Sequence, residues 1–224
     1  MEKSGFQEAE RAQLSFLAPL EKKCLLWLAH RMPGWVNSDH LTLLGFLAMF
    51  FAGLSYWLAS RNPLGLLLVV FWLAVNWFGD SLDGTLARVR NKQRPRYGFY
   101  VDKVVDTFSV FFLLGGMMLS GYIHPAIAAG VLIVYLMLTI EVYLATYTIG
   151  TFHLSFWKFS PTELRILLSV GNIVLLYRPR VELLGEHYRL LDVGGAASIV
   201  GMALMLITAV VRHTRLLYRA EPIA

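Results

Sequence analysis

The stretch from Asp80 to Asp106, DSLDGTLARVRNKQRPRYGFYVDKVVD, places four aspartates and six basic residues between two long apolar segments. Carboxylates at the edge of membrane-like segments are costly, so their presence calls for an explanation. Side chains three or four positions apart share one face of a helix, so Asp80 pairs with Asp83 and Asp102 pairs with Asp106. The connection between the two pairs is short enough to make their helices antiparallel neighbours. The carboxylates are therefore expected to face each other across a helix–helix seam.

Four facing carboxylates cannot all stay ionised unaided, because burying an unpaired ion costs several kcal/mol. Divalent cations resolve this problem, and all-oxygen ligation selects Mg²⁺ or Mn²⁺ ahead of Ca²⁺. Four negative charges balance two such ions, and a two-metal site is suited to clamping phosphoryl oxygens. Two other interpretations stay open. One is a solvated loop whose charges only orient the chain, and the other is a proton or cation relay in a transporter.

The composition indicates a polytopic membrane protein. Hydrophobic residues make up 57% of the 224 residues and charged residues 16%, and the mean hydropathy is +0.57. The formal net charge of +5 is explained by Lys and Arg in cytoplasmic loops, so nucleic-acid binding is not expected. The single cysteine, Cys24, excludes an intramolecular disulfide. The polar N-terminus indicates that the first span directs insertion, without a cleaved signal peptide.

The expected fold is all-α, with six transmembrane helices preceded by an amphipathic helix on the cytoplasmic surface. A span needs about 20 apolar residues, and six segments qualify: 41–60, 64–79, 98–121, 124–149, 161–177 and 190–211. The helix of the second segment is expected to continue past the membrane. The predicted division of the chain is a juxtamembrane segment at 1–40, a six-helix transmembrane domain at 41–213 and a cytoplasmic tail at 214–224.

The distribution of Lys and Arg predicts the orientation. With the N-terminus inside, sixteen of these residues fall on the cytoplasmic side and four on the other, so both termini are expected in the cytoplasm. Asp80 then lies about 24 Å along its helix, at the cytoplasmic edge. Before the first span, leucines between Leu14 and Leu28 recur at helical spacing. This pattern predicts a surface helix bent at Pro19, the alternative being a helix packed against the bundle.

At these residues the sequence resembles the CDP-alcohol phosphotransferase (CDP-alcohol phosphatidyltransferase) family. The signature of this family is DxxDGxxAR, eight or nine residues, then GxxxDxxxD. All eight fixed positions match, at Asp80, Asp83, Gly84, Ala87, Arg88, Gly98, Asp102 and Asp106. The stretch VNSDHLTLLG (36–45) also looks like the family's entry to the first span, with Asn37 and Thr42 at the usual places.

The resemblance implies a site and a reaction. Asp80, Asp83 and Asp102 would be the principal metal ligands, and Asp106 would complete the metal cluster and act as the catalytic base. The CDP-alcohol would be bound by Gly84, Ala87, Arg88, Gly98, Asn37 and Thr42. An alcohol hydroxyl would attack the β-phosphorus and CMP would leave, with Mg²⁺ or Mn²⁺ as cofactor. A homodimer is also implied, and GGMMLSG from Gly115 would serve either a dimer or intramolecular packing.

The donor and the acceptor are less determined. Candidates for an acceptor pocket are Glu141, Lys158, Glu163 and Arg165, which are all expected at the cytoplasmic level. Glu163 also suits a helix N-terminus, and Lys158 and Arg165 also suit the positive-inside rule. CDP-diacylglycerol is taken as the leading donor. Family members that use a phosphorylated acceptor resemble one another in carrying extra basic residues along the fourth span, and their absence from LTIEVYLATYTIG (138–150) argues against such an acceptor. The alternatives are transfer from CDP-choline or CDP-ethanolamine to diacylglycerol and, in another class, a transporter. The acids gather at one end, which favours the enzyme.

Overall fold

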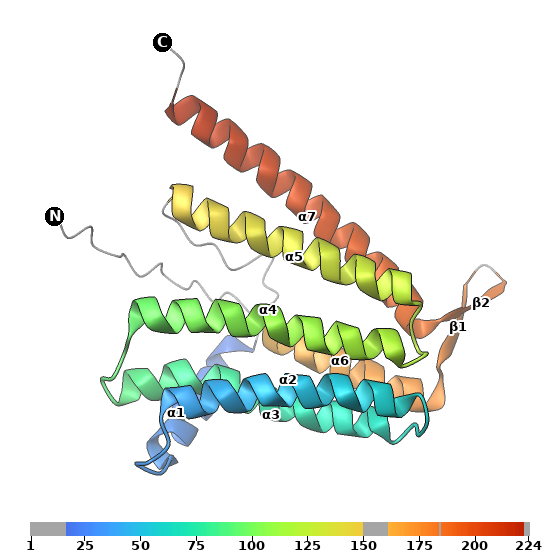
Figure 1. Ribbon diagram of the computed structural model, residues 1–224, viewed down its shortest axis with the longest axis horizontal. Helices are drawn as coiled ribbons and strands as arrows, with labels where there is room; N and C mark the ends of the chain where they lie inside the picture. The colour runs from blue at the N-terminus through green and yellow to red at the C-terminus, as the bar shows by residue number, and fades with distance from the viewer. Residues whose placement is uncertain (1–16, 150–160, 184, 222–224) are drawn as a thin grey trace.

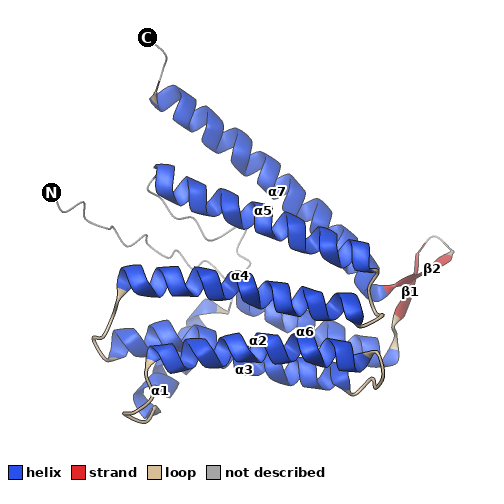
Figure 2. Ribbon diagram, viewed as in Figure 1, coloured by secondary structure: helices blue, strands red, loops and turns tan. Residues whose placement is uncertain are grey.

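The computed structural model describes residues 17–149, 161–183 and 185–221, which form a helical bundle with a small β-hairpin (Figure 1, Figure 2). The elements in chain order are α1 (Ala18–Arg31), α2 (Ser38–Ala59), α3 (Gly65–Val89), α4 (Pro95–Leu119), α5 (Pro125–Ile149), α6 (Pro161–Tyr177), β1 (Arg180–Leu183), β2 (Glu186–Arg189) and α7 (Leu190–Ala220). Each of the six predicted apolar segments forms a helix. As expected, α3 continues beyond residue 79, and α7 continues further than residue 211.

Helix α2 is the centre of the bundle, because it packs against both α3 and α4. A Cβ atom added to Gly79 of α3 would lie 2.6 Å from the backbone nitrogen of Gly45 in α2. On α4, a Cβ atom at Gly116 would overlap the carbonyl oxygen of Gly53 in α2. Glycine at these two crossings lets the helix backbones approach more closely than any side chain would allow.

The predicted seam between the two acid-bearing helices is not the main packing contact of either helix. Within the described residues, α3 and α4 each pack most extensively against α2. The physical reason is the position of the small residues, since Gly79 and Gly116 both face α2. The relative position of α3 and α4 is therefore set by their separate contacts with a third helix.

The remaining helices attach to this centre in two ways. Helix α6 packs against α3, and its buried Asn172 donates a hydrogen bond of 2.7 Å to the hydroxyl of Tyr56 in α2. Helices α5 and α7 pack against each other, and α5 also packs against α4 (Figure 1). Inter-helical hydrogen bonds of this kind are typical of helices that pack in an apolar medium.

The outer faces of the bundle are apolar along whole helices. Exposed residues at alternating spacings of four and three form a stripe on each of three helices: Leu43, Leu47, Phe50 and Leu54 on α2; Ile133, Met137, Ile140 and Leu144 on α5; Val200, Leu204, Ile207 and Val211 on α7. Exposed apolar surface of this extent suits lipid. Among the described residues, α2, α3, α5 and α7 are long and apolar enough to cross a membrane. The chain is thus a multi-pass membrane protein.

The count of six spans stays a prediction. Helix α4 carries charged residues in its first half, and α6 has 17 residues, so neither belongs to the four helices just named. Both nevertheless lie within the same bundle (Figure 1).

Helix α1 packs against α3 at one end of the bundle. Leu25 and Ala29 of α1 join Leu82 and Leu86 of α3 in a small apolar cluster. Of the two arrangements expected for this helix, these contacts match the helix packed against the bundle. The described part of this helix begins at Ala18, and Pro19 lies in its first turn, where proline is tolerated. The C-terminal end of α7 lies at the same end of the molecule as α1, and the β-hairpin lies at the other (Figure 1).

The structure contains a β-hairpin that the all-α prediction did not include. It forms within 178–189, between the fifth and sixth predicted spans. Strands β1 and β2 are antiparallel, with Val181 opposite Tyr188. Gly185 in the turn has a φ of 85°, which glycine adopts without steric strain. Val181 and Tyr188 are residue types that favour strands, and this preference was the available signal in the sequence.

The crossing of α2 and α4 can be tested with two adjacent glycines. Gly116→Ala should destabilise the protein by about 1–3 kcal/mol, because the new methyl group overlaps the backbone of α2. Gly115→Ala is the matched control, since a Cβ atom there would meet no described atom within 4 Å. Thermal unfolding in detergent micelles measures both changes. Equal stability of the two variants would contradict the close approach at Gly53.

Candidate metal and substrate site

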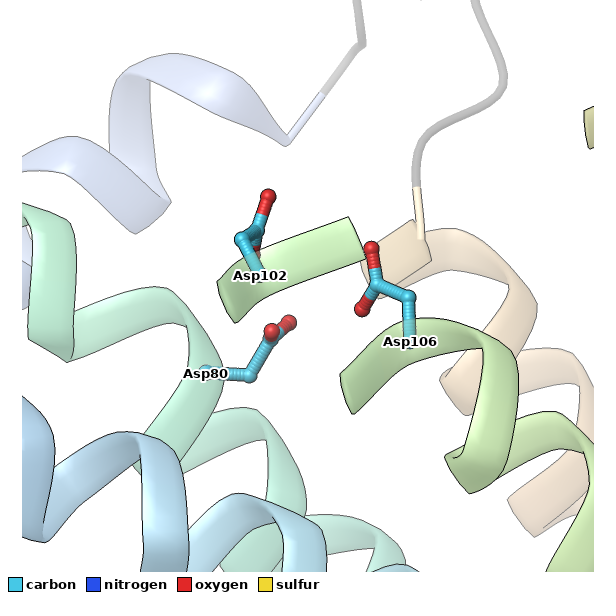
Figure 3. Close-up of side chains that lie close together, drawn as sticks. All are labelled: Asp80, Asp102 and Asp106. Atoms are coloured by element: carbon cyan, nitrogen blue, oxygen red, sulfur yellow. The ribbon is translucent and has the colours of Figure 1, made fainter. Parts of the chain in front are cut away.

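Three of the four predicted aspartates converge at the end of the bundle that carries α1. One carboxylate oxygen each from Asp80 of α3 and from Asp102 and Asp106 of α4 lie within 4.8 Å of one another (Figure 3). A set of three carboxylate oxygens is the donor set that Mg²⁺ and Mn²⁺ prefer. These residues therefore fit a divalent metal ion.

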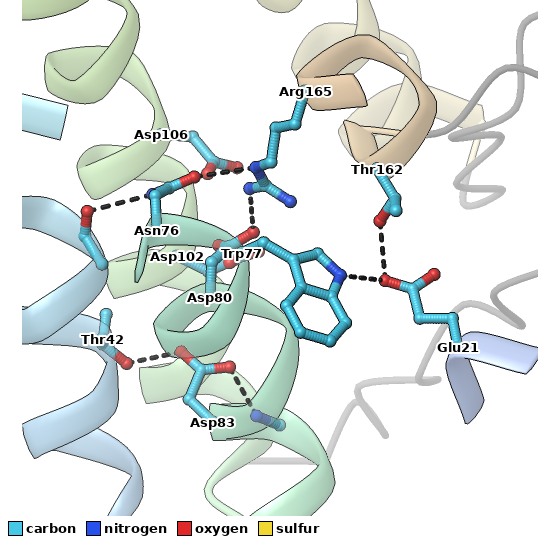
Figure 4. Close-up of polar contacts among 12 residues, drawn as sticks. Glu21, Thr42, Asn76, Trp77, Asp80, Asp83, Asp102, Asp106, Thr162 and Arg165 are labelled. Atoms are coloured by element: carbon cyan, nitrogen blue, oxygen red, sulfur yellow. Dashed lines mark hydrogen bonds and ion pairs between the residues drawn. The ribbon is translucent and has the colours of Figure 1, made fainter. Parts of the chain in front are cut away.

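Two basic side chains reach into this acidic cluster. The guanidinium of Arg165, from α6, lies 2.5 Å from the Asp80 carboxylate and donates a second hydrogen bond of 2.8 Å to Asn76, as Figure 4 shows. The ammonium of Lys103 lies 2.7 Å from Asp102 and 3.0 Å from Asp106. Arg165 was a predicted acceptor residue, and the structure places it on a predicted metal ligand. Sequence reasoning missed Lys103, although its position beside Asp102 was visible.

Asp83 lies outside the group of three. One of its carboxylate oxygens accepts a hydrogen bond of 2.6 Å from the hydroxyl of Thr42, and the other accepts one of 2.5 Å from the Gly84 nitrogen (Figure 4). Ser38, at the start of α2, donates to the backbone carbonyl of Asp83. Asp83 and Thr42 thus join α3 to α2 in this structure, and their predicted roles toward a metal and a CDP-alcohol stay predictions.

Gly84 and Gly98, the two glycines of the predicted site, differ from Gly79 and Gly116, which lie at the helix crossings. A Cβ atom at Gly84 or at Gly98 would meet no described atom within 4 Å. Helix packing therefore does not explain glycine at either position, whereas close approach of a ligand to the backbone would. Beside them, Ala87 is half-buried and Arg88 is exposed, and the Arg88 side chain contacts Thr85 at 3.2 Å.

Asn37 has a local structural role at the start of α2. Its side chain accepts a hydrogen bond of 3.0 Å from the backbone nitrogen of His40, and the His40 ring accepts one from the backbone nitrogen of Asn37. This reciprocal pair caps the helix. Capping alone accounts for asparagine here, and binding of a CDP-alcohol by Asn37 stays a prediction.

A small cavity of about 150 Å³ lies between α2 and α4, with Asp39, Thr42 and Tyr97 among its lining residues. At its edge Asp39 forms an ion pair with Arg94 at 2.5 Å. The hydrogen bonds from Arg94 to Asp39 raise the pKa of the arginine above its ordinary value, so this guanidinium stays charged. The remaining lining residues are apolar, and the cavity adjoins the Thr42 side of the site.

The other acceptor candidates in the described structure lie on different helices. Glu141 of α5 lies 2.6 Å from the Nδ1 atom of His213 in α7, and its second carboxylate oxygen is buried without a hydrogen-bond partner among the described residues. Glu163 lies half-buried in the first turn of α6, where the helix dipole favours a carboxylate. Lys158 lies outside the described residues. His213 was not predicted, because nothing in the sequence links it to Glu141.

Glu21 of α1 connects two helices that carry the site. Its Oε1 atom accepts hydrogen bonds of 2.8 Å from the indole of Trp77 in α3 and of 2.6 Å from the hydroxyl of Thr162 in α6 (Figure 4). Thr162 lies one helical turn before Arg165. This link therefore holds the start of α6 against α3, close to the ion pair between Arg165 and Asp80.

The fold and site define a multi-pass helical membrane protein with a carboxylate cluster at one end of its bundle. Comparison with known proteins gives the family. A model of the CDP-alcohol phosphatidyltransferase family matches residues 35–213, and the chain belongs to this family. An archaetidylinositol phosphate synthase from Pyrococcus horikoshii is 32% identical over 89 residues, which cover 40% of this chain and 44% of the relative. The match thus spans less than half of that protein's length.

The link through Glu21 can be tested by proteolysis. Glu21→Ala removes both hydrogen bonds to a charged acceptor, which are worth about 1.5–3 kcal/mol each, so α1 should detach more often. Trypsin should then cleave faster at the neighbouring Lys22 and Lys23, which are exposed. Glu21→Gln, which keeps the amide oxygen as an acceptor, should lie close to the wild type. Unchanged cleavage in Glu21→Ala would show that the link does not hold α1.

Proposed function

We propose that this protein is an enzyme of phospholipid synthesis that transfers a substituted phosphate from a CDP-alcohol to an alcohol hydroxyl and releases CMP. The observation that carries the proposal is the convergence of Asp80, Asp102 and Asp106. These are three of the four aspartates of the family signature, and they come from two helices that each pack most extensively against a third, α2. Tertiary contacts bring these three carboxylates together. Their convergence therefore favours a ligand site over a solvated loop whose charges only orient the chain.

The side chains have distinct roles in this proposal. Asp80, Asp102 and Asp106 would hold Mg²⁺ or Mn²⁺, and Asp83 would complete the set from its place beside Thr42. A dication bound there would neutralise the diphosphate and stabilise the departing CMP. The open faces of Gly84 and Gly98 let the diphosphate approach the helix backbones. Arg88 is exposed and suits a bidentate contact with phosphate oxygens.

The chemical step is a direct displacement. The acceptor oxygen forms a bond to the β-phosphorus, the bond from that phosphorus to the CMP oxygen breaks, and CMP carries away the negative charge. Asp106 takes the proton of the attacking hydroxyl. The bundle contributes by holding both substrates in line. The entropy cost of bringing them together is then met when they bind and not in the chemical step.

The donor favoured is CDP-diacylglycerol or a closely related CDP-activated lipid. The relative from Pyrococcus horikoshii is, by its name, a synthase of archaetidylinositol phosphate, which fits transfer of a lipid-bearing phosphate. The alternative donors, CDP-choline and CDP-ethanolamine, carry a cationic headgroup, for which Glu141 would be the candidate partner. One oxygen of Glu141 already contacts His213, which leaves its other oxygen for such a headgroup.

The membrane arrangement we propose has six crossings, both termini in the cytoplasm and the site at the cytoplasmic end. It is supported by α1 and the C-terminal end of α7, which lie at the same end of the bundle (Figure 1). At 17 residues, α6 is about 25 Å long, which is close to the thickness of the hydrocarbon core. The division at 1–40, 41–213 and 214–224 stays a prediction. A homodimer also stays a prediction, and Gly116 already serves packing within the protomer.

Asp106→Asn should reduce turnover by a factor on the order of 10²–10⁴, because the acceptor hydroxyl loses its base. The measurement is CMP release by purified protein given CDP-diacylglycerol, Mg²⁺ and a panel of phosphorylated and unphosphorylated alcohols. Binding of the CDP-alcohol should be partly retained. Asp192→Asn, at the opposite end of the bundle, is the control and should be unaffected. Wild-type turnover by Asp106→Asn would remove this residue as the base.

Glu141→Gln should change acceptor use more than donor affinity, since we place Glu141 in the acceptor pocket. The KM for the best acceptor of the panel should rise, and the affinity for the CDP-alcohol should stay within about twofold. His213→Gln is the companion variant and should shift the same parameter, because His213 contacts Glu141. A change confined to donor affinity would show that this assignment is wrong.

A further inference from the structure

Lys103 is the basic side chain most closely joined to the acidic cluster. Its ammonium contacts Asp102 at 2.7 Å and Asp106 at 3.0 Å, and 14% of its side-chain surface is exposed. In both aspartates the contact is with the Oδ2 atom. Each carboxylate has a second oxygen, so Lys103 occupies half of the ligand capacity that these two residues offer.

The presence of basic side chains changes the charge balance of the site. Four aspartates alone would balance two divalent ions, as the sequence indicated. Lys103 and Arg165 together bring two positive charges to three of these carboxylates, those of Asp80, Asp102 and Asp106. The four aspartates then keep a net negative charge of two, which a single Mg²⁺ or Mn²⁺ balances. Electrostatics therefore favours one bound ion in the enzyme without substrate.

The two basic residues differ in how readily they can move. Arg165 is held by Asn76 as well as by Asp80, and Asn76 in turn donates to the carbonyl of Gly45 at 3.0 Å. Within the described part of the chain, the side chain of Lys103 contacts the two aspartates themselves. A lysine is a point charge on a flexible stem, so its ammonium can leave Asp102 and Asp106 by rotation of its own side chain.

We propose that Lys103 is an internal cation that holds the place of the second metal ion until the nucleotide arrives. This inference rests on the proposed function. The diphosphate of the CDP-alcohol brings two further negative charges and new oxygen ligands. Its arrival lets a second ion bind Asp102 and Asp106, and the ammonium of Lys103 moves to a phosphate oxygen. Lys103 thereby couples binding of the second ion to binding of the nucleotide.

The test counts Mn²⁺ ions bound to the purified full-length protein, by titration calorimetry and by electron paramagnetic resonance, which detects spin coupling between neighbouring ions. The wild type should bind one Mn²⁺ in the absence of nucleotide and a second, spin-coupled ion when CDP is added. Lys103→Met should bind the second ion without CDP at least tenfold more tightly than the wild type does. Lys92→Met, an exposed lysine in the α3–α4 loop, should match the wild type.

Lys103→Gln provides a second neutral variant should Lys103→Met fold poorly, and thermal unfolding checks both. Two equally tight ions in the nucleotide-free wild type, with no change in either Lys103 variant, would overturn the inference and leave the proposed function standing. An absence of Mn²⁺ binding in the wild type and in both variants, with or without CDP, would overturn the metal site and the proposed function with it.

Discussion

The close approach of α2 to two other helices is the constraint on which the rest of the structure depends. Gly79 meets α2 at Gly45, and Gly116 meets it at Gly53. A larger residue at either crossing would push a helix outward, and the carboxylates carried by α3 and α4 would separate. Gly45 of α2 also contacts the backbone of α3 at Asp80, since a Cβ atom at Gly45 would be 3.2 Å from the Asp80 nitrogen. Packing in the apolar part of the bundle thus sets the geometry of the charged part.

The acidic cluster is tolerated in an apolar bundle because opposite charges accompany it. Unpaired carboxylates near the hydrocarbon region are costly, and paired ones are much less so. Arg165 comes from α6 and Lys103 from the same helix turn as the acids it contacts. The site therefore combines one basic residue fixed by a hydrogen-bond chain with one whose side-chain partners, within the described residues, are the acids. Our proposal that Lys103 is the movable charge rests on this asymmetry.

Residues far apart in the sequence support the site from two sides. Glu21 of α1 holds α3 and α6 together, and its apolar neighbours Leu25 and Ala29 pack on α3. On the other side, α5 and α7 carry the contact between Glu141 and His213. The residues that we propose for donor binding lie on α2, α3 and α4 or at the start of α2, whereas the described acceptor candidates lie on α5 and α6. This division suits an enzyme that must bring a nucleotide and a second alcohol to one cluster.

The sequence by itself determined the helices, the family and the identity of the acids. Hydrophobic runs of about 20 residues and the spacing of Asp80, Asp83, Asp102 and Asp106 are local properties, and local properties can be read along the chain. The hairpin at 180–189 was missed because short strands carry a weak local signal.

Only the tertiary structure decided which groups meet. It packed both acid-bearing helices against α2, left Asp83 outside the group of the other three aspartates, and brought Arg165, Lys103 and His213 to their acidic partners. The physical reason is that these contacts depend on how helices cross. Crossings are set by paired small residues such as Gly53 and Gly116, which lie 63 positions apart in the sequence. Such a pairing cannot be inferred from any single stretch of the sequence.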